Sequence, residues 1–307
     1  MKIDTELNEV TFIVIGKNEG KNLDRCFKSL KYYDAKIIYV DSGSLDNSIQ
    51  IAKENNLYKI VKVECDNGTP ALSRSVGANL VDTKYIHFVD GDMTIDKEWL
   101  KNAITFINTS EDICGVHGFK KVFTRNVKDY FILKDKESWL PDYLQGAFLI
   151  KTQIFRDVGG FDTRMYGEEE RDLYVRLLSN NTKIWYVDYL MGEHYDLKTK
   201  SFSRKYFSEC NANIWLPIFK SIKNNNFRKL IFVYRTLLPV LILELISFYY
   251  LIFNIQYSIF IQILIFLYSK YIKRPGFCII WKVALLNAPR LFKIINKRQE
   301  FNVINIK

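Results

Sequence analysis

The 307-residue chain has few cysteines and few histidines, the residues on which disulfide frameworks and zinc sites depend. Its five cysteines are odd in number and show no paired spacing, so we expect buried, reduced thiols in a cytosolic setting. Met1 to Val10 is polar and carries acids, without the basic start and apolar stretch of a signal peptide. The sequence also lacks internal repeats and low-complexity tracts.

Acidic residues are scarce in the last third of the chain. Residues 1–197 hold 26 Lys and Arg against 31 Asp and Glu, a balance of −5, whereas residues 198–307 hold 18 against 3, a balance of +15. A basic tail after an acidic body indicates a polyanionic partner surface. Because the tail also contains long apolar runs, an anionic membrane is favoured and no nucleic-acid partner is expected.

Apolar runs of strand length alternate with segments of helical spacing over the first hundred residues. This alternation predicts parallel βαβ units, and therefore an α/β sheet flanked by helices. The most informative run is 85–89, which leads directly into Asp90-Gly91-Asp92. The expected strands are 10–15, 35–40, 59–63 and 85–89, and later 145–150 and 183–187.

Polar residues follow three of these predicted strands. Lys17-Asn18-Glu19 follows the first, Asp41 ends the second, and Asp90 and Asp92 end the fourth. Open α/β sheets bind ligands at the carboxyl ends of parallel strands, so these side chains should converge on one edge as a nucleotide-type pocket. Glycine between two carboxylates permits a tight turn. Two hard oxygen ligands without a nearby thiolate suit Mg²⁺ or Mn²⁺ better than zinc.

Several motifs in register resemble the family 2 glycosyltransferases with the GT-A fold. The resemblance covers roughly residues 10–200 and implies a Rossmann-like, mixed but mostly parallel sheet. It is specific for fold and reaction class, and does not identify the sugar. The motifs are Ile-Gly-Lys-Asn-Glu at 15–19, Asp-Ser-Gly-Ser-Leu-Asp at 41–46, Ser-Arg-Ser-Val-Gly-Ala at 73–78, Asp-Gly-Asp at 90–92, Gly-Gly-Phe-Asp at 159–162 and Glu-Glu-Arg-Asp-Leu at 169–173.

The resemblance implies roles for residues of the donor half. Lys17-Asn18-Glu19 would belong to the nucleotide site, and Asp41 would hydrogen-bond the base. Asp90 would lie near the ribose and the metal, Asp92 would ligate the metal, and Arg74 would face the nucleotide. A nucleoside diphosphate leaving group needs such positive charge. Two alternatives remain open, since Asp41 could cap a turn and Arg74 could be a surface arginine.

The acceptor half supplies a candidate base and further contacts. Glu170 aligns with the base of the family, with Glu169 as the alternative, because the family commonly has Glu-Asp where this chain has Glu-Glu. Clustered acids can raise one another's pKa, which suits a base. Gly146 could let an acceptor approach the backbone. His194 is a possible additional metal or diphosphate ligand, or a structural histidine.

The tail predicts attachment to a membrane. Residues 201–223 interleave aromatic and basic residues, typical of an amphipathic helix on a membrane or of a helix packed on the catalytic domain. Residues 245–269 carry no charge, and basic residues flank the apolar stretch from 230. We expect a hairpin that breaks near 254–256 and keeps both flanks inside. A single span and a monotopic hairpin remain alternatives, because Arg235 and Glu244 are costly in lipid.

The sequence thus predicts a catalytic domain over 1–200, with a nucleotide half at about 10–95 and an acceptor half at about 96–200, followed by a membrane-associated helical region over 201–307. The expected function is that of a metal-dependent, inverting glycosyltransferase at the cytoplasmic membrane face. Its acceptor would be a saccharide or lipid-linked sugar in cell-surface polysaccharide, lipopolysaccharide or glycolipid synthesis. The rival functions are those of a nucleotidyltransferase and of a non-catalytic membrane scaffold.

Overall fold

The computed structural model divides the chain into two compact units, residues 1–200 with 298–307, and residues 201–297. The last ten residues therefore belong to the first unit, although the sequence placed them in the C-terminal region. The structure describes residues 6–65, 68–123, 130–133, 146–165, 169–195, 242–243, 246–247, 249–250, 255–271 and 301–307.

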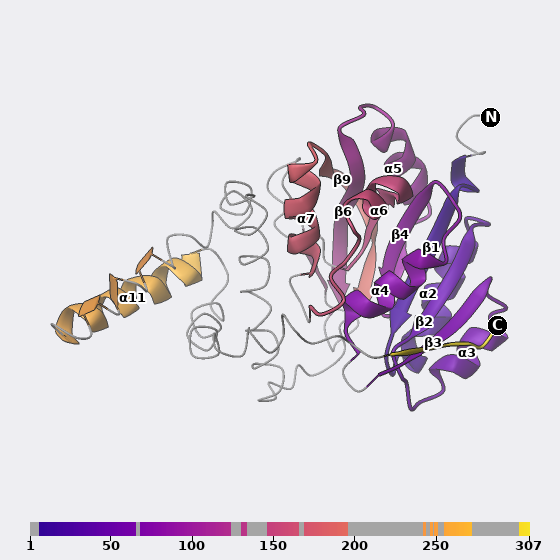
Figure 1. Ribbon diagram of the computed structural model, residues 1–307, viewed down its shortest axis with the longest axis horizontal. Coiled ribbons are helices and arrows are strands. Elements are labelled where there is room, and N and C mark those ends of the chain that lie inside the picture. The colour runs from indigo at the N-terminus through magenta and orange to yellow at the C-terminus, as the bar shows by residue number, and fades with distance from the viewer. Residues whose placement is uncertain are drawn as a thin grey trace. The chain divides into compact units, whose positions relative to one another are not determined.

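The first unit is built on a ten-stranded mixed sheet (Figure 1). Its donor half contains four parallel strands in the order β3-β2-β1-β4, which places the carboxyl ends of β1, β2 and β4 side by side. The predicted βαβ units are present, and each observed strand lies within one residue of its expected bounds. These strands are β1 (Val10–Gly16), β2 (Lys36–Asp41), β3 (Lys59–Glu64) and β4 (Tyr85–Asp90).

The acceptor half continues the same sheet in the order β4-β8-β6-β9-β5, with β7 paired to β6. The strand expected at 183–187 runs on to Tyr195, because it pairs with β6 along its length and then with β5. The sequence did not predict β5, β6 or β7. The bounds are β5 (Met93–Ile95), β6 (Ile113–Phe123), β7 (Tyr130–Leu133), β8 (Phe148–Lys151) and β9 (Lys183–Tyr195).

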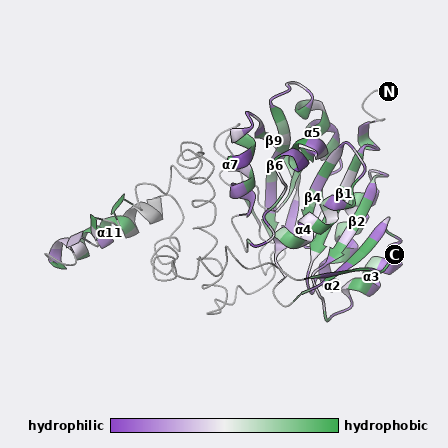
Figure 2. Ribbon diagram, viewed as in Figure 1, coloured by the Kyte–Doolittle hydropathy of each residue, from purple (hydrophilic) through white to green (hydrophobic). Residues whose placement is uncertain are grey.

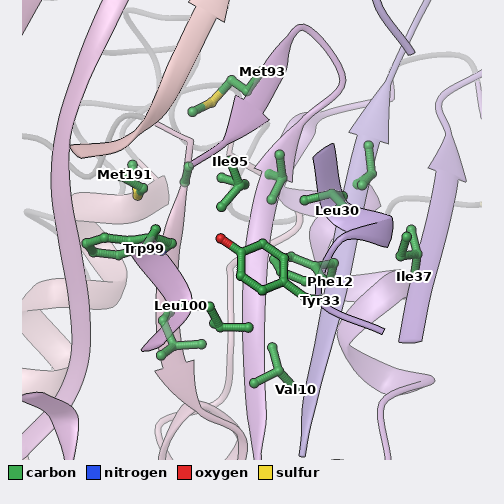
Figure 3. Packing of buried hydrophobic residues seen from close by; sticks show 14 of the residues in the cluster. Val10, Phe12, Leu30, Tyr33, Ile37, Met93, Ile95, Trp99, Leu100 and Met191 are labelled. Carbon is green, nitrogen blue, oxygen red and sulfur yellow. The ribbon is translucent and has the colours of Figure 1, made fainter. Parts of the chain in front are cut away.

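Helices cover the sheet and bury its apolar side chains, and Figure 2 shows the hydrophobic residues on the strands and the adjoining helices. Figure 3 shows Met93 and Ile95 of β5 in the same apolar cluster as Trp99 and Met191. The backbone that carries Asp92 is therefore anchored in the core. The helices are α2 (Gly20–Lys31), α3 (Ser48–Glu54), α4 (Pro70–Asn79), α5 (Trp99–Ile107), α6 (Thr152–Asp157) and α7 (Glu169–Ser179).

A short C-terminal strand, β10 (Asn302–Asn305), was not expected from the sequence. It pairs antiparallel with β3 at the edge of the sheet, with Asn302 opposite Glu64. Backbone hydrogen bonds continue beyond the strand, since Ile306 N donates to Ile60 O over 2.8 Å and Ile60 N to Lys307 O over 3.2 Å. The chain thus returns to the first unit after residues 201–297.

The second unit contains α11 (Ile255–Tyr271), which begins where the predicted hairpin breaks. Among the residues that the structure describes, no helix is both long and apolar enough to cross a membrane. The predicted amphipathic helix at 201–223 and most of the apolar hairpin lie outside the described residues. Membrane attachment of this region therefore stays a prediction.

Candidate functional site

Arg74 lies at the centre of the site and connects the two halves of the sheet. Its Nη2 donates to Asp90 Oδ1 and its Nη1 to Glu169 Oε1, each over 2.8 Å, while its own side chain is 4% exposed. Burial alone would lower the pKa of Arg74, but the carboxylates of Asp90, Glu169 and Glu170 outweigh that effect and raise it. The guanidinium therefore stays charged and clamps two carboxylates that are far apart in sequence.

The position of Arg74 follows from how α4 begins and packs. Thr69 caps the helix by accepting a hydrogen bond from Leu72 N over 3.0 Å, and Pro70 occupies the first turn. A Cβ on Gly77 would lie 2.5 Å from Ile13 Cγ2, so this glycine lets the helix approach β1 closely. The arginine is consequently buried against the sheet, which excludes the alternative of a surface arginine.

Glu170 occupies a different environment from Glu169, although both are buried in the first turn of α7. Its Oε1 accepts a hydrogen bond from Gly146 N over 2.7 Å, and its Oε2 has no hydrogen-bond partner among the described residues. Burial raises the pKa of Glu170 to about 7, with a smaller contribution from Glu169, while Arg74 opposes the shift. Glu170 is thus a carboxyl group that can gain or lose a proton near neutral pH.

Gly146 lies next to two acids of the site, Asp90 and Glu170. Its φ is +78°, and an added Cβ would lie 2.0 Å from Asp90 Oδ2. The Gly146 amide donates a hydrogen bond to Glu170. A glycine is required here because any Cβ would clash with Asp90 and because φ is positive. This requirement exists without any acceptor, and the predicted role of Gly146 in acceptor approach stays a prediction.

Asp92 and His194 meet on the other side of the Asp-Gly-Asp turn. His194 Nε2 lies 3.3 Å from Asp92 Oδ2, with the two side chains 23% and 17% exposed. The pairing of β5 with β9 brings them together, because Met93 lies opposite His194. Within the described ranges, no group of three or more His, Cys, Asp or Glu side chains is placed to hold a metal ion. The carboxylate oxygen suits Mn²⁺ or Mg²⁺, and the neighbouring imidazole nitrogen is a common additional metal ligand in proteins.

The other residues predicted for the nucleotide site lie at the same edge of the sheet, where Asp41 forms hydrogen bonds within the protein. Asp41 is fully buried, and it accepts hydrogen bonds from Tyr39 OH, Gly43 N and Ser44 N over 3.0, 2.9 and 2.7 Å. It therefore holds the turn after β2, which was the alternative left open for it. The predicted hydrogen bond between Asp41 and the base stays a prediction.

The loop after β1 is held against that same turn. Asn18 N donates to Ser44 Oγ over 2.9 Å, and Asn18 Oδ1 accepts from Leu45 N over 2.8 Å. Glu19 is buried and accepts a hydrogen bond from Asn22 Nδ2 over 2.9 Å. These contacts shape the loop, whereas Lys17 lines a cavity at this edge.

Lys120 is a buried cation of this site that the sequence did not indicate. Its side chain is 1% exposed and its Nζ lies 4.0 Å from Met93 Sδ. Burial lowers its pKa to about 8, and the nearby acids Asp90, Glu170 and Asp92 oppose that shift. A lysine in a strand ordinarily faces solvent, so only the pairing of β6 with β7 and β9 reveals its position.

Comparison with known proteins gives a family match and distant relatives. Residues 11–164 match the family model described as glycosyl transferase family 2. The pre-mycofactocin glycosyltransferase of Mycobacterium tuberculosis is 21% identical over 211 residues, which cover 61% of this chain and 42% of that protein. The chain spans less than half the length of the curated relatives that it matches.

Solved structures show the same fold at low identity. The S. aureus TarS 1–349 structure in complex with UDP has a TM-score of 0.53 and 22% identity, over 68% of this chain and 65% of that one. The mannosyltransferase PcManGT from Pyrobaculum calidifontis, in complex with GDP-Man and Mn²⁺, has a TM-score of 0.62 and 12% identity, over 92% and 87% of the two chains. At these identities the likeness concerns the fold alone.

Proposed function

Because the chain belongs to glycosyl transferase family 2, we propose that it transfers a sugar from a nucleotide sugar to an acceptor hydroxyl, with inversion at the anomeric carbon. The observation that carries this proposal is Glu170, a buried carboxyl group with a pKa of about 7 and one oxygen without a partner among the described residues. Such a group suits a general base, since it can take a proton at neutral pH.

The proton and bond changes follow from this role. The acceptor oxygen forms a bond to the anomeric carbon of the donor, and the bond from that carbon to the diphosphate oxygen breaks. Glu170 Oε2 takes the hydroxyl proton, while the electron pair of the broken bond leaves with the nucleoside diphosphate. Glu169 is less suited to this role, because its Oε1 is already engaged by Arg74 over 2.8 Å.

The nucleoside diphosphate that leaves is negatively charged, so cations near it would stabilise its departure. Asp92 and His194 would hold Mg²⁺ or Mn²⁺, with the diphosphate and water completing the coordination. Such an ion, when bound, neutralises the charge that develops on the diphosphate. Arg74 holds Asp90 in place, and Lys120 adds positive charge behind the Asp-Gly-Asp turn. Two structural neighbours were solved in complex with UDP and with GDP-Man, which supports a nucleotide sugar as the donor class.

We also propose that the second unit attaches the enzyme to the cytoplasmic membrane, so that the acceptor is a saccharide or a lipid-linked sugar used there. The described residues of this unit support the proposal, because polar side chains are buried between them while large apolar side chains are exposed. Ser247 Oγ lies 3.0 Å from Ser258 Oγ and accepts from Gln262 Nε2 over 2.8 Å, and the two serines are buried. Large apolar side chains face outward, including Ile259 and Phe260 at 56% and 57% exposure.

Ile261 and Ile265 are buried as in a hairpin in water, but such a hairpin would not also leave large apolar side chains exposed. Polar contacts between helices with an apolar exterior suit a lipid environment. The balance of +15 over residues 198–307 adds attraction to anionic lipids.

The function is tested by incubating the purified full chain with a panel of nucleotide sugars and either Mn²⁺ or Mg²⁺, and by identifying the phosphate-containing product. The proposal expects slow hydrolysis of one donor that yields a nucleoside diphosphate and free sugar. A parallel incubation with nucleoside triphosphates and sugar phosphates tests the rival function, since a nucleotidyltransferase would join the two and release pyrophosphate from the triphosphate. Absence of turnover with every donor, together with absence of nucleotide binding, would support a non-catalytic scaffold.

A further inference from the structure

A cavity of about 500 Å³ opens at the edge of the sheet where β1, β2 and β3 end. This volume lies within the range of about 300–1,000 Å³ that is usual for small-molecule sites. Its walls come from segments that are far apart in sequence, including one that follows the second unit. Lining residues include Lys17, Ser42, Gly43, Cys65, Phe301 and Asn302.

The C-terminal segment is held at this edge by its own strand. β10 runs antiparallel to β3, so the start of β10 lies where β3 ends, and Asn302 pairs with Glu64. The backbone bonds between Ile60 and residues 306–307 hold the other end of the segment. Phe301, directly before the strand, is therefore brought to the cavity at the carboxyl ends of β2 and β3. Figure 1 shows the C-terminal strand in yellow beside β3.

The chemistry of the cavity wall suits a planar heteroaromatic group. Phe301 is 42% exposed as a residue, and the neighbouring Asn302 offers an amide that can both donate and accept hydrogen bonds. Aromatic rings form platforms on which nucleobases stack. Because the carboxylate of Asp41 is fully buried and holds the turn after β2, a base in this cavity meets that turn rather than the carboxylate.

We propose that Phe301 and Asn302 complete the nucleobase subsite of the donor, with the Phe301 ring stacked on the base and the Asn302 amide at its edge. This inference rests on the proposed function, since a nucleotide sugar supplies the base. It assigns part of the donor site to a segment that lies outside residues 11–164, the part of the chain that matches the family model.

The test compares ligands with and without a base. The full chain is titrated calorimetrically with UDP, GDP and pyrophosphate, each in the presence of Mn²⁺. Phe301→Ala should weaken binding of whichever nucleoside diphosphate the wild type binds by about fivefold to twentyfold, as expected for loss of one partly exposed stacking contact. Binding of pyrophosphate should stay unchanged, and Phe301→Trp should restore the affinity for the nucleoside diphosphate.

Two further variants keep the outcome decisive. Val303→Ala, on the same strand but not among the lining residues, should leave both affinities unchanged. If Phe301→Ala does not fold, Phe301→Leu keeps an apolar side chain without a ring and carries the same expectation. Unchanged nucleoside diphosphate affinity in the Phe301 variants, or an equal loss for pyrophosphate, would overturn this inference alone. A wild type that binds no nucleoside diphosphate, with CDP, ADP and dTDP added to the titration, would overturn it together with the proposed function.

Discussion

Replacing Arg74 with methionine tests whether the site depends on one buried cation. The substitution keeps an unbranched apolar stem and removes the guanidinium that bonds Asp90 and Glu169 over 2.8 Å. The contact with Glu169 carries most of the effect, because both side chains are nearly buried at 4% and 7% exposure, whereas Asp90 is 29% exposed and partly solvated. Removal of one partner of a buried ion pair costs about 3–5 kcal/mol, so we expect Arg74→Met to lose about that much unfolding free energy.

Equilibrium unfolding in urea measures this loss, with a second substitution to identify its cause. Arg74→Met combined with Glu169→Gln should recover at least about 1 kcal/mol relative to Arg74→Met, because the buried charge left behind is then removed. Lys28→Met is the matched control, since its ion pair with Asp24 is exposed at 70% and 51%, and it should leave the midpoint unchanged. A loss below about 1 kcal/mol for Arg74→Met, or no recovery in the double variant, would refute the argument.

Three further expectations concern the metal, the glycine and the tail. Asp92→Asn should lower turnover at least about a hundredfold while the thermal midpoint stays near that of the wild type; full activity in excess chelator would contradict a metal role. Gly146→Ala should lower turnover and cost about 1–3 kcal/mol of stability, because its Cβ would meet Asp90. Gly159→Ala has a comparable φ of +83° but no atom within 4 Å of its Cβ, so it should show the strain without the loss of turnover. The full chain should sediment with membranes in high salt, and complete release by salt would contradict an apolar attachment.

The donor half of the sheet was predictable because its signals are local. The apolar runs at β1, β2 and β4 are continuous, and their pairing follows from the alternation of strands and helices. Because these strands are parallel neighbours, Lys17, Asp41 and Asp90 at or just beyond their carboxyl ends lie at one edge of the sheet. The role of Asp41 was harder to predict, because a carboxylate at a strand end can bind a base or hold a turn. Only the hydrogen bonds from Gly43 and Ser44 show that it holds the turn.

The acceptor half and the sheet edges depend on contacts that are distant in sequence. β6 contains glycines and lysines, so no apolar run marks it, and Lys120 becomes buried only through pairing with β7 and β9. β10 has four residues and a partner more than 200 positions earlier in the chain, beyond the reach of a local pattern. Glu169 and Glu170 are alike in sequence, and they differ only because Arg74 bonds one and Gly146 the other.

The pH–rate profile of donor hydrolysis, measured for the wild type, Glu170→Gln and Glu169→Gln, tests the central claim most directly. Wild-type turnover should rise as the pH passes through about 7, because Glu170 acts as a base only after it loses its proton. Glu169→Gln should keep this rise but move it to lower pH, because the Glu169 carboxylate that helps to raise the pKa of Glu170 is gone. Glu170→Gln should lose about 10²–10⁴-fold and show no rise, while its affinity for nucleoside diphosphate stays normal. If Glu170→Gln instead kept the rise and Glu169→Gln abolished it, Glu170 would not be the base.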